Sequence, residues 1–401
     1  MKWHWASTDS ISNLGIDPIK HLSLNDELTS PFLCFEFLKA LEASFCVGES
    51  IHRRTGWLPS HILIKNENDE LIAFIPAYIK THSYGEYIFD HSWAHAYQQH
   101  GLPYYPKLIF AIPFTPVSGP RIFKLTNISN DQIVTFLADQ KEAIFKQLNV
   151  SSIHLLFPNK ELSNTFDTMH FYTRHSVQFN WHNKQYTDFE SFLESMTARR
   201  RRSIKKERKS IAKQGVTVEK LYGKHLTKEA MDFFCLCYKQ TYLKRSGHEG
   251  YLNNAFFFEL LENMQDNLLL VVANKQSNID NDSTHIVSTP VAASLFLFDH
   301  NGLYGRYWGA LEDVSGLHFE CCYYQGIEFC IEHNIPLFNP GTQGEHKILR
   351  GFEPTICYSN HSMAEPAFDD AVKDFLIRET PHIKEYAIQS ADLLPFKDDS
   401  Q

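Results

Sequence analysis

Residues 302–352 read GLYGRYWGALEDVSGLHFECCYYQGIEFCIEHNIPLFNPGTQGEHKILRGF, and this stretch decides the fold. Its pattern predicts a strand, an acidic turn, a helix over 317–333, a second strand, a glycine-rich loop and a short final helix. The alternation of the first strand places its glycines on one face, where a helix can approach closely. The other face carries a row that is costly to bury without partners, and we expect it to line a cleft: Tyr304, Arg306 and Trp308.

The helix over 317–333 contains the candidate catalytic residues. Helical spacing places Glu320 on the same side as tyrosines and isoleucines, where a carboxylate loses hydration and suits a general base or acid. His318 is the second candidate for this role. Gln325 falls on the polar side and is a candidate substrate contact. The alternative is a structural Glu320, buried and held by a tyrosine hydroxyl.

The loop that follows the second strand is rich in glycine, which lets the backbone turn and point its amides outward at a helix start. Cationic and polar side chains at helical spacing project beside these amides. Such a group can receive a carbonyl, carboxylate or phosphate, although the same residues could form a plain helix end. The candidate binding residues here are Gln343, Gly344, His346, Lys347 and Arg350.

Composition bounds the class of protein. The 401 residues suffice for two domains, and the net charge of −9 argues against a general nucleic-acid binder. The start shows no signal peptide and no apolar run is long enough to span a membrane, so we expect a cytoplasmic protein without integral membrane contact. The eight cysteines look like small core residues. Metal is not expected, because the His-x-Glu at position 318 lacks the Pro-Cys-x-x-Cys partner of zinc deaminases.

The first half of the chain holds one unusual stretch, residues 82–123, crowded with His, Trp, Tyr and Pro. Long ordered loops of this kind are usually functional, although this one could simply pack over a domain seam. We expect it to contribute substrate contacts from Tyr105, Lys107 and Arg121.

The pattern begins anew after residue 175, and a long basic helix is predicted over 188–213. A row of cations along one face of this helix can track phosphates, although a charge run is often only a solvated surface. The candidate nucleic-acid contacts are Arg199, Arg202, Lys206 and Lys209.

Several blocks resemble a known family: KTHSYGEYIFDHSWAHAY, YYPKL, PFTPVSGPR, RRRRSIKKER, LYGRYWGA, LHFECCYYQGIEF and GTQGEHKILRGF. They look like the FemAB-like proteins of the GNAT acyltransferase superfamily, and the resemblance runs from about residue 57 to the C-terminal helix. It implies an α/β fold (α+β, with mixed sheets) built from tandem GNAT-like domains of the Fem type. We place the N-terminal domain at 1–175 and the C-terminal domain at 176–401.

The resemblance implies acyl transfer, most simply of an aminoacyl group from aminoacyl-tRNA to an amine of a peptide or peptidoglycan precursor. No bound cofactor is expected. One alternative is an N-acetyltransferase that uses acetyl-CoA. The loop over 310–316 disfavours that donor, because it has a single glycine and two acidic residues, Glu312 and Asp313, that would repel a diphosphate. A second alternative is a protein that recognises a cell-wall fragment or peptide without chemistry.

Overall fold

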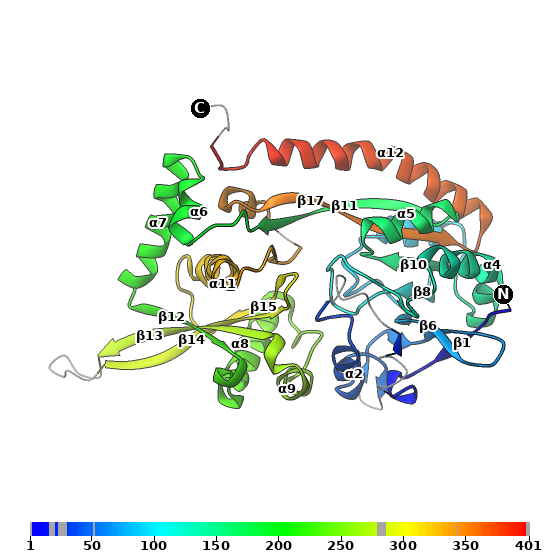
Figure 1. Ribbon diagram of the computed structural model, residues 1–401, viewed down its shortest axis with the longest axis horizontal. Coiled ribbons are helices and arrows are strands. Elements are labelled where there is room, and N and C mark those ends of the chain that lie inside the picture. The colour runs from blue at the N-terminus through cyan, green and yellow to red at the C-terminus, as the bar shows by residue number, and fades with distance from the viewer. Residues whose placement is uncertain are drawn as a thin grey trace. The chain divides into compact units, whose positions relative to one another are not determined.

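The computed structural model describes residues 2–15, 21–22, 30–50, 53–278, 286–342 and 344–397. The chain forms two compact units, drawn in Figure 1: Met1–Val177 with Ile356–Ala387, and Gln178–Thr355 with Ile388–Gln401. The chain leaves the first unit within β11 (Tyr172–His182) and returns to it within β17 (Glu353–Met363). The domain boundary between residues 175 and 176 stays a prediction.

The first unit contains two sets of strands, one antiparallel and one mixed. One follows the order β1-β5-β6-β9, and the other follows β17-β10-β8-β7-β4, in which β8 and β10 run parallel. The strands are β1 (His4–Thr8), β4 (Trp57–Pro59), β5 (His61–Lys65), β6 (Leu71–Ile75), β7 (Ala77–Lys80), β8 (Lys107–Phe110), β9 (Phe123–Lys124) and β10 (Ser152–Leu156), beside the short pair β2 (Glu49–Ser50) and β3 (Arg53–Arg54). The helices are α2 (Phe35–Ala43), α3 (His91–Gln99), α4 (Asn130–Leu148), α5 (Lys160–Thr168) and most of α12 (Pro366–Ala391).

The core of this unit forms where α4 and α5 cover the strands. Ile133 and Leu137 of α4 belong to the same hydrophobic core as Ile62 and Ile64 of β5, and burial of such side chains contributes about 2 kcal/mol each. A capping box at Ser129 fixes the start of α4, because its hydroxyl accepts from the amide of Gln132.

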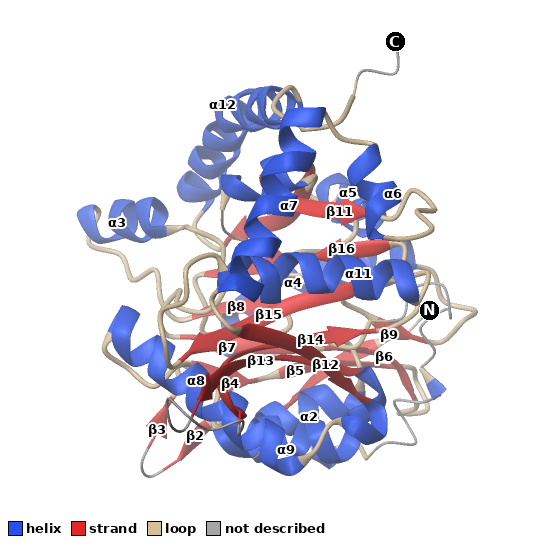
Figure 2. Cartoon of the chain, turned by 90° about the vertical axis from the view of Figure 1, so that its left-hand side faces the viewer, coloured by secondary structure: helices blue, strands red, loops and turns tan. Residues whose placement is uncertain are grey.

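The second unit is a sheet in the order β12-β13-β14-β15-β16-β11. Figures 1 and 2 show α8 and α9 on one face of these strands and α11 on the other. The strands are β12 (Val216–Tyr222), β13 (Leu268–Asn278), β14 (Ile286–Phe298), β15 (Leu303–Ala310) and β16 (Leu337–Asn339). The helices are α6 (Phe189–Glu194), α7 (Ala198–Lys213), α8 (Lys228–Ser246), α9 (Asn254–Asn263), α10 (Leu317–Phe319) and α11 (Gln325–Glu332), with a π turn at Glu320–Tyr324 and a 3₁₀ helix, η6, at Glu345–Arg350.

The glycine face of β15 receives a helix, as the sequence predicts. A Cβ on Gly309 would lie 2.1 Å from the backbone carbonyl carbon of Cys237 in α8. Only glycine permits this approach, so β15 and α8 are held in close contact.

Three elements differ from the sequence prediction. The long helix over 188–213 is two helices, because Met196 pairs with Phe396 in an extended bridge between α6 and α7. The helix over 317–333 contains the π turn, which sequence periodicity does not reveal. The aromatic stretch around residues 91–99 forms the helix α3 rather than an irregular loop. Among the described helices, none combines the length and the apolar character needed to cross a bilayer.

Candidate active site

The sheet of the second unit opens between β15 and β16. These strands pair in parallel at Leu303 with Phe338 and at Tyr304 with Asn339. β16 ends at Asn339, whereas β15 continues to Ala310, so the two strands stop pairing there, and we call the place beside the later residues of β15 the opening. Ligands of α/β proteins commonly bind beyond the carboxyl ends of parallel strands.

Two cations meet at this opening. Nη2 of Arg306 donates to Oδ1 of Asn339 at 2.9 Å, and Nζ of Lys347 donates to the carbonyl oxygen of Gly341 at 2.5 Å. Burial and the nearby charge of Arg306 lower the pKa of Lys347 to about 7. A buried lysine that titrates near neutral pH beside an arginine is typical of a functional site.

A set of aromatic and imidazole rings in contact with one another also belongs to this site. The ring centroids of Trp308 and His318 lie 5.5 Å apart, and those of His318 and Tyr323 lie 5.3 Å apart. The Tyr323 hydroxyl is 2.8 Å from Nε2 of His346. Burial, together with the surrounding imidazole and cations, lowers the pKa of His318 to about 4. We call six residues the opening cluster: Arg306, Trp308, His318, Tyr323, His346 and Lys347.

The π turn changes where Glu320 and Gln325 lie. In a π turn the side chains five positions apart come together, and Nε2 of Gln325 donates to Oε1 of Glu320 at 2.8 Å. Arg208 of α7 donates to both oxygens of the same carboxylate, with Nη2 2.8 Å from Oε1 and Nε 3.1 Å from Oε2. Both Glu320 oxygens therefore already accept hydrogen bonds from a guanidinium, a partner different from the tyrosine hydroxyl that the sequence suggested.

Glu320 and Gln325 line a cavity of about 610 Å³ beside α7, together with Arg208 and apolar side chains of α6, α7 and β12. Nη1 of Arg208 also binds Glu328 at 2.6 Å. The guanidinium is thus neutralised by two carboxylates, and this cavity is distinct from the opening between β15 and β16.

Arg350 connects α7, which borders the cavity, with α10 and the π turn. Its guanidinium lies 3.5 Å from the centroid of the Phe319 ring, and it binds the Tyr324 hydroxyl and Oε2 of Glu207 at 2.9 and 2.8 Å. Arg350 is buried and its guanidinium is hydrogen-bonded to protein groups, which indicates a structural role in the site.

Three further predicted residues have separate positions. Tyr304 is buried at the start of β15, and burial and the charge of Asp299 raise its pKa. Gly344 has φ +107°, a conformation that favours glycine, and it begins η6. Gln343 lies outside the described residues.

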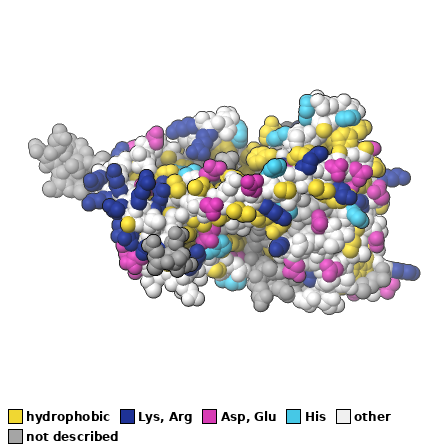
Figure 3. All heavy atoms as spheres, turned by 90° about the horizontal axis from the view of Figure 1, so that it is seen from above, with side chains coloured by type: hydrophobic (Ala, Val, Ile, Leu, Met, Phe, Trp, Pro, Cys, Tyr) yellow, Lys and Arg dark blue, Asp and Glu magenta, His cyan; other side chains and the backbone are white. Residues whose placement is uncertain are grey.

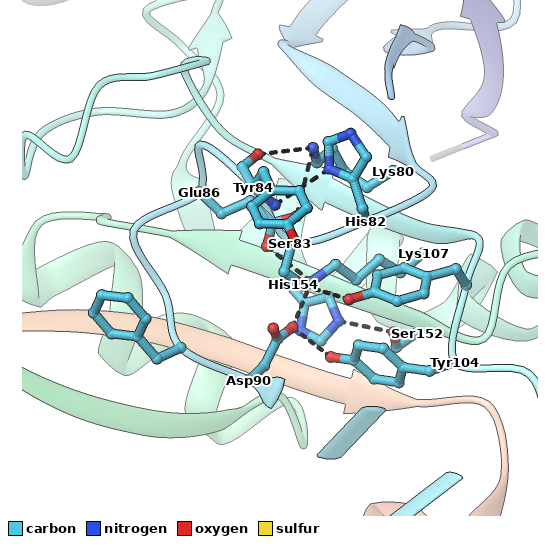
Figure 4. A network of polar contacts seen from close by, with 12 residues as sticks. Lys80, His82, Ser83, Tyr84, Glu86, Asp90, Tyr104, Lys107, Ser152 and His154 are labelled. Atoms are coloured by element: carbon cyan, nitrogen blue, oxygen red, sulfur yellow. Dashed lines mark hydrogen bonds and ion pairs between the residues drawn. The ribbon is translucent and has the colours of Figure 1, made fainter. Parts of the chain in front are cut away.

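In the first unit, Lys107 is the centre of a buried polar network, which Figure 4 shows. Its ammonium donates to Ser83 at 2.9 Å and to Glu86 at 2.8 Å, and it also pairs with Asp90. The hydroxyl of Tyr105 is 2.8 Å from that of Ser83. Lys107 thus neutralises two buried carboxylates, while Tyr105 connects the network to the surface.

A pocket of about 700 Å³ lies beside Tyr105, lined by α3 and the chain that follows it, including His91, His95, Gln98 and Tyr104. It offers imidazole, amide and aromatic groups to a ligand. Arg121 lies elsewhere, buried, and donates to the backbone carbonyl oxygens of Val117, Pro120 and Leu156. That arrangement indicates a structural role for Arg121.

The basic helix α7 presents its candidate nucleic-acid contacts to solvent. Figure 3 shows Lys and Arg side chains gathered over the end of the molecule where Figure 1 draws α7. The exposed residues on this helix include Arg199, Arg202, Lys206 and Lys209. Within the described ranges, no three His, Cys, Asp or Glu side chains are placed to hold a metal ion.

The match to a known family covers nearly the whole chain. Residues 14–398 match the FemAB-like proteins, described as a family of peptidoglycan biosynthesis and recognition. The chain belongs to the FemAB-like family. This membership identifies it as an enzyme of the transferase type. No curated protein matches the chain.

Several solved structures are similar to this FemAB-like protein. The crystal structure of FemX aligns with a TM-score of 0.51 and 10% identity, over 90% of this chain and 97% of that one. A tandem GNAT protein from the clavulanic acid biosynthesis pathway aligns with a TM-score of 0.45 and 8% identity, over 91% and 99%. L-PGS from Bacillus licheniformis aligns with a TM-score of 0.46 and 10% identity, over 88% and 99%. The likeness to FemX shows the predicted fold class, a mixed α/β protein of the tandem GNAT-like, Fem type.

Sequence reasoning missed three residues around the opening cluster and the neighbouring cavity of this FemAB-like protein, and a fourth, Asp90, in the buried network of the first unit. Glu207 and Arg208 lie inside a basic run, which gave no sign that these two positions face inward. Their partners are more than a hundred positions away, so no local spacing could pair them. Tyr323 was grouped with Glu320 because the π turn was not foreseen, and Asp90 lies in a stretch without a recognisable pattern.

Replacing Arg208 by Met tests the ion pairs beside α7. The variant leaves Glu320 buried without its cation, and we expect the free energy of unfolding to fall by about 3 kcal/mol. Urea denaturation followed by circular dichroism measures the loss. Lys206→Met, on the exposed side of the same helix, is the matched control and should change stability by less than about 0.5 kcal/mol. Equal effects of the two variants would contradict the assigned role of Arg208.

Proposed function

We propose that this FemAB-like protein transfers an aminoacyl group to an amine of a peptide or peptidoglycan precursor. The observation that carries the proposal is the convergence of Arg306 and Lys347 on the opening between β15 and β16. A buried lysine and a half-buried arginine at the end of a parallel strand pair can stabilise the oxyanion that forms when an amine attacks an acyl carbon.

The other residues of the opening cluster support orientation of the substrates. The rings of Trp308 and His318 form a wall beside the cations, and the backbone amide at Gly344 can donate a hydrogen bond. Holding an ester and an amine in reacting geometry can supply a large part of the rate acceleration. The pocket beside Tyr105 in the first unit offers imidazole, amide and aromatic groups that suit a peptide or a sugar.

Aminoacyl-tRNA is the proposed donor, and the reaction would take place in the cytoplasm. The exposed cations of α7 can neutralise phosphates, with an affinity that falls as salt rises. The loop between β15 and α10 disfavours acetyl-CoA, because Glu312 and Asp313 stand where a diphosphate would need amides. Lys275 already pairs with Glu312 at 2.5 Å, which leaves that lysine less available for an anion.

An assay with two donors tests the proposal. The protein is incubated with a muramyl pentapeptide and either tRNA charged with labelled amino acids or labelled acetyl-CoA, and mass spectrometry identifies the product. We expect the pentapeptide to gain an aminoacyl group. An acetylated product would favour the acetyl-CoA alternative, and binding of the pentapeptide without any product would favour pure recognition.

Replacing Lys347 by Met tests the oxyanion role. We expect kcat to fall by roughly 10²–10³-fold, because the transition state loses a charged donor while the apolar stem is kept. Since the pKa of Lys347 is lowered to about 7, the wild-type rate should also fall as pH rises above neutrality and the ammonium is lost. Lys239→Met, at an exposed ion pair on α8, is the control and should leave kcat unchanged. A normal kcat for Lys347→Met would contradict the assignment.

A further inference from the structure

Two adjacent residues of α7 hold the π turn at its two ends. Arg208 binds Glu320, the first residue of the turn, and Oε2 of Glu207 accepts from the hydroxyl of Tyr324, the last residue, at 2.5 Å. Because the π turn adds a residue to the helical repeat, neighbouring side chains are redirected. Tyr324 turns to α7, while Tyr323 contacts His318 and His346 in the opening cluster.

The hydrogen bond from this turn fixes the imidazole of His346. Its Nε2 lies 2.8 Å from the hydroxyl of Tyr323, which is buried, whereas His346 itself is exposed. The ring lies against the backbone of Gly344, where a Cβ would come within 2.1 Å of Cε1. The glycine therefore makes room for an imidazole that is anchored through Nε2 in a side chain exposed to solvent.

The other titratable groups of the site are less available to accept a proton from a substrate. The oxygens of Glu320 are occupied by Arg208 and Gln325 beside a different cavity. His318 is packed between Trp308 and Tyr323, and with its pKa lowered to about 4 it holds a proton weakly. Lys347 is buried and bonded to the Gly341 carbonyl oxygen.

We propose that His346 accepts the proton of the attacking amine and that Tyr323 is the positioning residue that orients it. This inference rests on the proposed acyl transfer from an ester donor. The amine nitrogen forms a bond to the acyl carbon, the ester C–O bond breaks, and the leaving oxygen takes the electron pair. The proton of the amine passes to Nδ1 of His346 and then to the leaving oxygen, while the Tyr323 oxygen accepts the hydrogen bond from Nε2–H.

This role makes the reaction sensitive to acid. The titratable and charged groups around His346 are His318 of α10, Tyr323 of the π turn, and Lys347 and Arg350 of η6. Burial, Arg350 and Lys347 lower the pKa of His346 below its ordinary 6.5, so the imidazole is neutral at neutral pH. On the acid side of the profile, the rate should fall once the pH drops into the range where His346 gains a proton, whereas the fall above neutral pH belongs to Lys347.

Steady-state kinetics with charged tRNA and the muramyl pentapeptide test the role. We expect His346→Gln to lower kcat about 100-fold or more, to leave KM within about 3-fold, and to abolish the acid limb of the pH profile. Tyr323→Phe, which removes only the hydroxyl, should lower kcat about 10-fold and keep the acid limb. The control is His333→Gln, an exposed histidine at the end of α11, which should behave as wild type. Wild-type kinetics for His346→Gln would overturn the inference while leaving the proposed function intact.

Nitrogen NMR of histidine-labelled protein gives a readout independent of turnover, with His346→Gln identifying the resonance. We expect the proton of neutral His346 on Nε2 and an unprotonated Nδ1, and a loss of this preference in Tyr323→Phe. A proton on Nδ1 in the wild type would overturn the inference, whatever the transfer assay gives. Absence of any transfer by the wild type would instead overturn the proposed function, and this inference with it.

Discussion

Replacing Lys107 by Met should lower the free energy of unfolding by about 3–5 kcal/mol at pH 8. Lys107 is 1% exposed, and its ammonium is the shared partner of Glu86 and Asp90, which are also buried. Methionine fills a similar volume but leaves both carboxylates close together without that cation. Urea denaturation of the full chain measures the loss.

The pH dependence of the same variant gives a sharper test. In the wild type burial raises the pKa of Asp90, but the attraction of Lys107 outweighs this effect and holds the pKa below its ordinary 3.8. The wild type therefore loses this stabilisation only in strong acid, as the pH falls below 3.8 through the lowered pKa. Without Lys107 the carboxylates repel, so protonation becomes favourable and the deficit of the variant should be smaller at pH 5 than at pH 8.

The matched control for Lys107→Met is Lys65→Met. Lys65 pairs with Asp69 at 2.9 Å, but the carboxylate is 70% exposed, and such surface pairs contribute little to stability. If Lys107→Met costs no more than Lys65→Met, the network is not the buried ionic centre that the geometry indicates.

Replacing Gly309 by Ala should both destabilise the second unit and lower the activity of the site at the opening. The new Cβ would lie 2.1 Å from backbone atoms of Cys237 and 2.7 Å from the amide nitrogen of Tyr238, and a helix backbone cannot yield as a side chain can. We expect α8 and β15 to move apart, at a cost of about 3 kcal/mol. Because β15 carries Arg306 and Trp308, their displacement should lower kcat by about 100-fold.

Gly119→Ala is the control for this packing argument. A Cβ there would find its nearest neighbour, Nη1 of Arg121, at 3.7 Å, which is an ordinary contact. Its stability should stay within about 0.5 kcal/mol of the wild type. Thermal unfolding and urea titration compare the two variants, and equal stability of Gly309→Ala and wild type would contradict the close contact of β15 with α8.

The sequence predicted the elements whose patterns are local. Alternation along β15 separated a glycine face from the face of Arg306 and Trp308, and the structure places α8 on the first and the opening beside the second. The turn of glycines before η6 and its end at Gly351, with φ +85°, were likewise readable from residue types.

The remaining features depend on partners far away in the chain. Hydrogen bonds to Glu207 and Arg208 stabilise the irregular π turn, and no periodicity within residues 317–333 can reveal these partners. Once the turn forms, Glu320 faces α7 and Tyr323 takes the place beside His318. The break between α6 and α7 similarly requires Phe396, two hundred positions away from Met196. The roles of the site residues in catalysis stay predictions.

Affinity labelling with N-bromoacetyl-alanyl-tRNA tests most directly whether acyl transfer takes place at the opening between β15 and β16. The reagent places an alkylating group where the acyl group of the donor would bind, and peptide mass spectrometry locates the adduct. The account predicts alkylation of His318 or His346, suppressed by an excess of uncharged tRNA. Labelling confined to His91 and His95 of α3, or labelling that uncharged tRNA does not suppress, would contradict it.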